Sequence, residues 1–116
     1  MLTRRTLILA ATPLALLACG RRPDPQGPSG ETPEVHRLVD RYADRYGVPQ
    51  DLVHRIVRHE SNYNPAARNG PYYGLMQLAP QTARTIGYRG PDEGLLDAET
   101  NLTYGVKYLR GAWLVS

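Results

Sequence analysis

The chain has 116 residues, of which 41% are hydrophobic and 22% are charged, and these fractions are typical of a soluble globular protein. This length leaves room for one domain with a modest core. Fourteen Lys and Arg residues stand against eleven Asp and Glu residues, but without Arg4 and Arg5 of the extreme N-terminus the excess falls to one positive charge. The other basic residues are scattered and form no patch, so we expect no nucleic-acid partner.

The first eighteen residues have the layout of an export signal. Arg4 and Arg5 precede an apolar stretch from Leu7 to Leu17, as the charged region of a signal peptide precedes its hydrophobic region. The stretch is shorter than the about 20 apolar residues that a membrane-spanning helix needs. Thr3 to Leu7 also resembles a twin-arginine export motif, so both the general secretory and the twin-arginine routes stay open.

Cys19 is the only cysteine of the chain, and it ends the sequence Leu16-Leu17-Ala18-Cys19. These four residues resemble the lipobox of bacterial lipoproteins, which implies that Cys19 is lipidated and becomes the mature N-terminus. A lone cysteine in an exported protein has no intramolecular disulfide partner, which fits this role. We therefore expect a periplasmic protein anchored to a membrane, in the first place the outer membrane, through Cys19. The alternative is an ordinary secretory signal and a secreted protein.

Residues 20 to 33 read GRRPDPQGPSGETP and contain four prolines and no hydrophobic residue. In a partly polyproline conformation such a segment spans up to roughly 40 Å at about 3.1 Å per residue. We expect residues 19 to 33 to combine the lipid-anchor cysteine with a disordered tether. The tether would let a folded domain, residues 34 to 116, reach a layer beside its membrane.

Apolar residues recur at helical spacing in four segments of the folded part. The expected helices cover residues 34–46, 49 to between 62 and 65, 80–86, and 98 onward. Asp97 is a suitable N-cap for the last helix. Two loops rich in glycine and proline, residues 66–74 and 88–96, separate the helices. No segment shows the alternation of a β-strand, so the predicted fold class is mostly α.

Glu60 has an unusual position for a carboxylate. It follows Val53 by seven residues and Ile56 by four, which places it within about 20° to 40° of the apolar stripe of its helix. Burial and the negative end of the helix dipole would both disfavour the ionised form and raise the pKa of Glu60, as a general acid near neutral pH requires. The same position equally fits a helix-end residue whose stem packs while its carboxylate reaches solvent.

Four motifs accompany Glu60 in order and span nearly all of residues 48 to 110. They are Glu60 to Pro65 (ESNYNP), Gly74 to Gln77 (GLMQ), Pro80 to Arg84 (PQTAR), and Glu99-Thr100-Asn101 followed by Gly105 and Tyr108-Leu109. Together they resemble the catalytic domain of the lytic transglycosylases. The resemblance implies a lysozyme-like helical domain that acts on the glycan strands of peptidoglycan and needs no cofactor.

The resemblance also implies a mechanism for Glu60. The carboxylic acid would protonate the glycosidic oxygen between N-acetylmuramic acid and N-acetylglucosamine. As a carboxylate it would then take the proton of the muramoyl C6 hydroxyl, which attacks C1 and forms a 1,6-anhydro ring. Because the substrate supplies the nucleophile, the second carboxylate of most glycosidases is not needed.

Further sugar contacts are implied by the same resemblance. Gln77 is expected to donate hydrogen bonds to sugar, with an amide that satisfies loop backbone as the alternative. Of Tyr72 and Tyr73, one is expected to stack on a sugar ring and the other to pack, with the choice open. Ser61 and Asn101 complete this set, although Ser61 fits better as a residue that holds the helix end and the loop, and Asn101 fits core packing at least as well as substrate contact.

The chain departs from the family pattern at three places. Asn69, also an expected sugar contact, stands where family members commonly carry a serine, and Ala79 stands where a methionine is common. Family domains also continue into a helix whose tyrosine contacts the catalytic glutamate, whereas this chain stops at Ser116. We therefore expect a domain that lacks its final helices: a fragment, a frameshifted product, or a compact variant whose cleft a protein partner completes.

Two other functions are alternatives to the transglycosylase. A hydrolase resembling goose-type lysozymes would add water instead of forming the anhydro ring, and an inactive lipoprotein would only bind peptidoglycan. A zinc enzyme is not expected, because His54 and His59 are five residues apart, which puts them about 140° apart on a helix. No HExxH motif is present either, and we predict no metal site.

Overall fold

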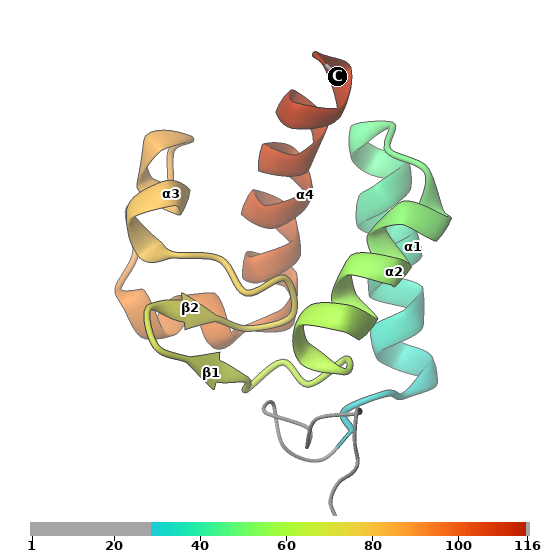
Figure 1. Ribbon diagram of the computed structural model, residues 1–116, viewed down its shortest axis with the longest axis horizontal. Helices are drawn as coiled ribbons and strands as arrows, with labels where there is room; N and C mark the ends of the chain where they lie inside the picture. The colour runs from blue at the N-terminus through green and yellow to red at the C-terminus, as the bar shows by residue number, and fades with distance from the viewer. Residues whose placement is uncertain (1–28, 116) are drawn as a thin grey trace, which may run out of the picture.

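The computed structural model describes residues 29 to 115. Its helices are α1 (Pro33–Tyr46), α2 (Gln50–Ser61), α3 (Pro80–Thr85), the 3₁₀ helix η1 (Asp92–Leu96) and α4 (Ala98–Leu114), and its strands are β1 (Arg68–Asn69) and β2 (Tyr72–Tyr73). The predicted mostly α fold is confirmed. In Figure 1, α4 runs through the middle of the domain, with α1 and α2 on one side and α3 and the strands on the other.

The export signal, Cys19 and most of the predicted tether lie outside the described residues, so these expectations stay predictions. Within residues 29 to 115, no helix is both long and apolar enough to cross a membrane. The structure differs from the predicted tether only over its last residues, 29 to 33, which lie against the domain or in α1. Pro33 is the first residue of α1, and the backbone N–H of Gly30 donates to the carbonyl of Asn62 over 3.1 Å.

Local signals explain where the helices begin and end. The Thr32 hydroxyl accepts a hydrogen bond from the Val35 N–H at the start of α1, and Gly47 ends that helix in a left-handed conformation with a φ of 67°. Asp97 caps α4 as predicted, because its carboxylate accepts from the Thr100 N–H over 3.0 Å. A capping side chain or a glycine thus sets both ends of α1 and the start of α4, within a residue of the expected positions.

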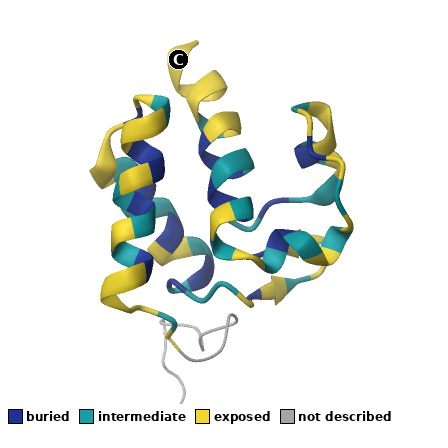
Figure 2. Cartoon of the chain, turned by 180° about the vertical axis from the view of Figure 1, so that it is seen from behind, coloured by how far each residue is buried: buried dark blue, intermediate teal, exposed yellow. Residues whose placement is uncertain are grey.

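Two hydrophobic clusters hold the domain together. The larger one lies where α1, α2 and α4 face one another, and its fully buried members include Val39, Val57 and Leu102. The smaller one lies under the strands, α3 and η1, and contains Tyr73 and Leu95. In Figure 2 the buried residues face inward along the helices, whereas the last turns of α4 are exposed.

The short elements on either side of α3 were not predicted. β1 and β2 pair antiparallel, with Arg68 opposite Tyr73 and Asn69 opposite Tyr72. Two-residue strands are too short to show an alternating pattern, so only the turn residues of this segment were visible in the sequence. The short 3₁₀ helix η1 was likewise missed, because Leu95 is its one buried residue.

Candidate active site

A groove with a volume of about 310 Å³ opens between α2, α4, α3 and the residues that follow β2. Its lining consists of Ile56, Tyr72, Met76, Gln77, Leu78, Ala79, Thr82, Gly105, Tyr108, Leu109 and Ala112. Most of these side chains are apolar, and Gln77 brings a carboxamide to the wall. Such a surface suits a ligand with both apolar faces and polar groups.

Glu60 lies in the last turn of α2, four residues after Ile56 and on the same side of the helix. It does not line the groove itself but lies one turn beyond the Ile56 wall. Of the two positions left open for Glu60, the structure fits the partly exposed one, since the buried side of α2 is formed by Val53, Val57 and Ser61 and Glu60 is only half-buried. Glu60 therefore lies at the border between the core and solvent.

Ser61 lies in the core and is not among the groove residues, which fits its expected supporting role rather than a sugar contact. Its side chain is fully buried, and its Oγ lies 3.0 Å from the Val57 carbonyl and 2.8 Å from the Leu75 carbonyl. The hydroxyl can donate to either carbonyl. Ser61 thus ties the end of α2 to the GLMQ segment.

Asn101 is also fully buried and is not placed to bind sugar. Its Nδ2 donates to the carbonyls of Tyr73 and Leu95 over 2.8 and 2.9 Å. Its Oδ1 accepts from the Met76 N–H over 2.8 Å. Asn101 therefore positions the loop from α4 behind the groove wall.

Gly74 allows the loop to approach Asn101 closely. A Cβ at this position would lie 2.5 Å from Asn101 Nδ2 and 2.5 Å from the Leu95 carbonyl oxygen, and its φ is +77°. Both the space and the backbone conformation require glycine here. The glycine of the GLMQ motif therefore serves the same loop contact as Asn101.

Gln77 lines the groove, but its amide is engaged by the loop. Its Nε2 donates to the Gly74 carbonyl over 3.0 Å and to the Ala67 carbonyl over 3.3 Å. Its Oε1 accepts from Asn69 Nδ2 over 2.9 Å. Both amide hydrogens are thus used, and what Gln77 offers a ligand is the second lone pair of Oε1.

The structure decides between the two adjacent tyrosines. Tyr72 is 48% exposed and lines the groove, whereas Tyr73 is 7% exposed and belongs to the smaller core cluster. The guanidinium of Arg68 lies 3.8 Å from the centre of the Tyr73 ring. Neighbouring residues of a strand point to opposite faces, so Tyr72 fits the stacking role and Tyr73 fits the packing role.

Sequence reasoning placed Gly105, Tyr108 and Leu109 in a family motif but did not identify α4 as a wall of the groove. Gly105, Tyr108, Leu109 and Ala112 all line it, and their spacing of three, one and three residues places them on one helix face. A Cβ at Gly105 would lie 2.6 Å from the Met76 sulfur, so the glycine lets the loop lie against α4. The spacing of these four residues in the sequence would have identified this face of α4.

Within residues 29 to 115, no three His, Cys, Asp or Glu side chains gather as a metal site requires. Among the described residues, those that line the groove include no Asp or Glu. Fold and site thus define a class of small helical domain in which one half-buried carboxylate lies at a helix end beside an apolar groove.

The sequence profile of the family described as Transglycosylase SLT domain matches residues 37–113, which is more than half of the chain. The chain belongs to this family. The resemblance seen in the ordered motifs is thereby confirmed.

Individual relatives match over a similar region. The chain is 38% identical over 81 residues to the soluble lytic murein transglycosylase of Escherichia coli, covering 63% of this chain and 12% of that protein. It is 33% identical over 78 residues to the membrane-bound lytic murein transglycosylase F of Desulfosudis oleivorans, covering 66% and 16%. The membrane-bound lytic murein transglycosylase C of Haemophilus influenzae matches at 34% over 80 residues, covering 62% and 22%. The chain thus spans less than a quarter of the length of each relative.

Changing Asn101 to Asp tests the loop anchor. The substitution keeps the acceptor for Met76 but removes both donors and places a carboxylate against two carbonyls, so we expect a loss of about 3 kcal/mol in the free energy of unfolding. Urea unfolding measures the change in the free energy of unfolding. Gln81→Asp on α3 is the control, because it changes an exposed amide to a carboxylate. Equal stability of both variants would show that the loop does not depend on Asn101.

Proposed function

We propose that this domain is a peptidoglycan lytic transglycosylase, which cleaves the β-1,4 bond between N-acetylmuramic acid and N-acetylglucosamine and leaves 1,6-anhydromuramoyl ends. Membership of the SLT family and the names of the relatives support this activity. The observation that carries the proposal is the position of Glu60, half-buried at the end of α2 and one turn beyond the groove wall.

One carboxylate is sufficient for this reaction. Glu60 in its protonated form donates its proton to the glycosidic oxygen as the bond to the muramoyl C1 breaks. The resulting carboxylate takes the proton of the C6 hydroxyl while the C6 oxygen bonds to C1. Glu60 ends the cycle protonated, as it began, so no water is consumed.

The remaining contacts come from the groove wall. The half-exposed ring of Tyr72 offers an apolar face on which a sugar ring can stack. Gln77 offers Oε1, so it accepts a hydrogen bond from a sugar hydroxyl or from the N-acetyl N–H rather than donating one. Asn69 acts through Gln77, because its amide holds that oxygen. The proposed acceptor role of Gln77 replaces the donor role first expected of it.

Two alternatives share the same groove. A lysozyme-type hydrolase is favoured by the partial exposure of Glu60, since water can reach the carboxylate. An inactive peptidoglycan-binding lipoprotein would use the groove alone. A protein partner that completes the cleft stays a prediction, and the exposed side chains of Tyr108 and Leu114 on α4 are the surface on which to seek it.

Changing Glu60 to Gln tests the catalytic assignment. A protein of residues 20 to 116 is expected to release 1,6-anhydromuropeptides from cell-wall sacculi, and the variant to lose about 10³-fold or more of that rate because its amide cannot transfer the proton. Mass spectrometry of the soluble products measures release, and sedimentation with sacculi measures binding, which should persist.

Glu93→Gln, an exposed change on η1, is the matched control and should leave the rate unchanged. Retained release in the Glu60 variant would refute its catalytic role. Reducing ends in place of anhydro ends would identify a hydrolase. Binding without release in the unaltered protein would identify the inactive module.

Changing Tyr72 to Ala tests the stacking contact. Loss of the ring should raise KM about 5- to 30-fold and change kcat little, because stacking holds the substrate and the transition state alike. Tyr72→Phe keeps the ring face and should keep KM. An unchanged KM in the alanine variant would exclude Tyr72 as a sugar contact.

We further propose that the protein acts in the periplasm, held to a membrane through lipidated Cys19. The relatives include both soluble and membrane-bound enzymes by name, which is compatible with this location. Cys19→Ala is expected to move the protein from the membrane fraction to the soluble fraction, as judged by fractionation and by the mass of the N-terminal peptide. An unlipidated N-terminus in the unaltered protein would leave the secreted alternative.

A further inference from the structure

The N-terminal segment lies against the turn that follows Glu60. The Gly30 N–H donates to the Asn62 carbonyl over 3.1 Å. A Cβ at Gly30 would lie 2.3 Å from the Tyr63 carbonyl oxygen and 2.6 Å from the Asn64 Cα, so backbone packs directly on backbone. Only glycine fits this contact without displacing the segment.

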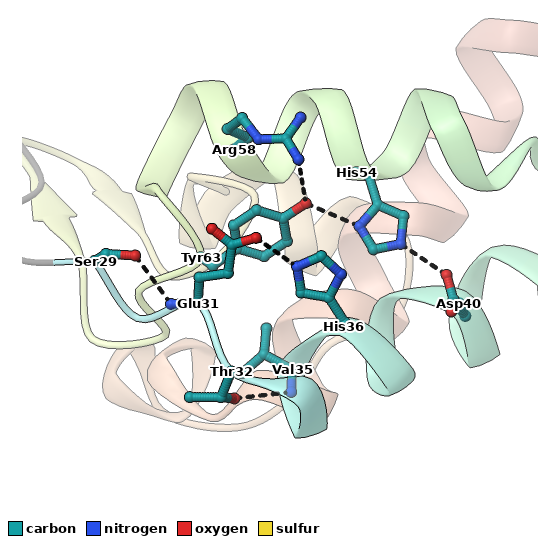
Figure 3. Close-up of polar contacts among 9 residues, drawn as sticks. All are labelled: Ser29, Glu31, Thr32, Val35, His36, Asp40, His54, Arg58 and Tyr63. Atoms are coloured by element: carbon teal, nitrogen blue, oxygen red, sulfur yellow. Dashed lines mark hydrogen bonds and ion pairs between the residues drawn. The ribbon is translucent and has the colours of Figure 1, made fainter.

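Side chains extend the contact to α1, as Figure 3 shows. His36 Nε2 lies 2.7 Å from Glu31 Oε2. The ring of His36 stacks on the ring of Tyr63, with centroids 4.6 Å apart and an interplanar angle of 15°. We call residues 29–31 together with His36 the N-terminal clasp.

Tyr63 links the clasp to α2 and α1. Its side chain is fully buried, and its hydroxyl lies 2.9 Å from His54 Nδ1 and 3.3 Å from Arg58 Nη2. His54 Nε2 lies 2.7 Å from the Asp40 carboxylate, which can only accept. His54 Nδ1 is thus left to accept from the Tyr63 hydroxyl when the imidazole is neutral. Burial raises the pKa of the Tyr63 phenol above its ordinary value and keeps that donor protonated.

The turn needs such support because its backbone is strained. Asn62 and Tyr63 are consecutive non-glycine residues in the left-handed region, with φ values of 52° and 61°. This conformation is unfavourable for an aromatic residue and persists only where surrounding contacts hold it. Glu60 lies two residues before the turn, so the conformation of Asn62 and Tyr63 determines where α2 ends and how its last turn is aimed.

We propose that the N-terminal clasp is a positioning element of the active site, which holds the Asn62–Tyr63 turn and thereby orients the carboxylate of Glu60. The proposal rests on the proposed role of Glu60 as the acid and base. The clasp does not touch substrate. Through the clasp, the conformation of the segment that precedes α1 would affect the rate of the chemical step.

Changing Gly30 to Ala tests the clasp in the protein with its whole N-terminal segment. The added methyl would push residues 29–31 off the turn, so the Asn64 amide, which donates to the Ser61 carbonyl over 2.9 Å, should exchange its hydrogen about tenfold faster. The kcat for release of muropeptides should fall about tenfold with KM within about twofold of its original value. Gly111→Ala is the control, because a Cβ there has no neighbour within 4 Å.

Changing His36 separates the ring stack from a general loss of stability. His36→Ala removes the ring from Tyr63 and should lower kcat, whereas His36→Phe keeps a ring on Tyr63 and should restore most of it. Failure of His36→Phe to restore kcat, or an unchanged kcat in His36→Ala, would contradict the positioning role. The midpoint of thermal unfolding of each variant shows whether the domain is still folded.

The two readouts separate this proposal from the proposed function. Unchanged exchange at Asn64 in Gly30→Ala would overturn the clasp, and faster exchange with an unchanged kcat would overturn its role in positioning Glu60. If the unaltered protein releases nothing from sacculi, the proposed function fails, and the positioning role fails with it even where exchange shows that the clasp holds the turn.

Discussion

The carboxamide of Asn101 is the contact on which the groove depends. It pairs with one N–H and two carbonyls of the loops, belonging to Met76, Tyr73 and Leu95. The Tyr73 carbonyl also accepts from the Leu78 N–H, but the Met76 N–H and the Leu95 carbonyl would lose this side-chain partner without Asn101, and a buried polar group without a partner is costly. Aspartate lacks the donors, leucine lacks all polar atoms, and glutamine is longer by a methylene group. Since both sides of the amide are needed at this distance, asparagine is the residue that fits.

The rest of the wall is built on the loop held by Asn101. Gly74 and Gly105 let the loop lie close to Asn101 and to α4, and Gln77 closes it by pairing with the Ala67 and Gly74 carbonyls. The side-chain amides of Gln77 and Asn101 thus serve mainly to hold the loop in place. A site of this kind is arranged before substrate arrives, which lowers the cost of ordering it during the reaction.

The parts that could be predicted from the sequence are those encoded by local spacing. Helix periodicity, Asp97 as a cap and Gly47 as a stop place the helices, and the spacing from Ile56 places Glu60 on the same side of α2 as that groove residue. The ordered motifs identified the family. Local signals of this kind need no knowledge of which segments meet in space.

What could not be predicted depends on partners far along the chain. Asn101 finds the Tyr73 carbonyl 28 residues away, and Ser61 finds the Leu75 carbonyl 14 residues away. A sequence shows that a polar side chain is present, but the tertiary fold decides whether backbone or sugar is its partner. The choice between Tyr72 and Tyr73 depended in the same way on a strand of two residues.

The contact made by Gly30 has a further consequence, because it brings the chain into the domain at the same end of α2 as Glu60. In a protein held by its N-terminus, the length of the tether would therefore set how far from the attachment point a glycan strand can be cut.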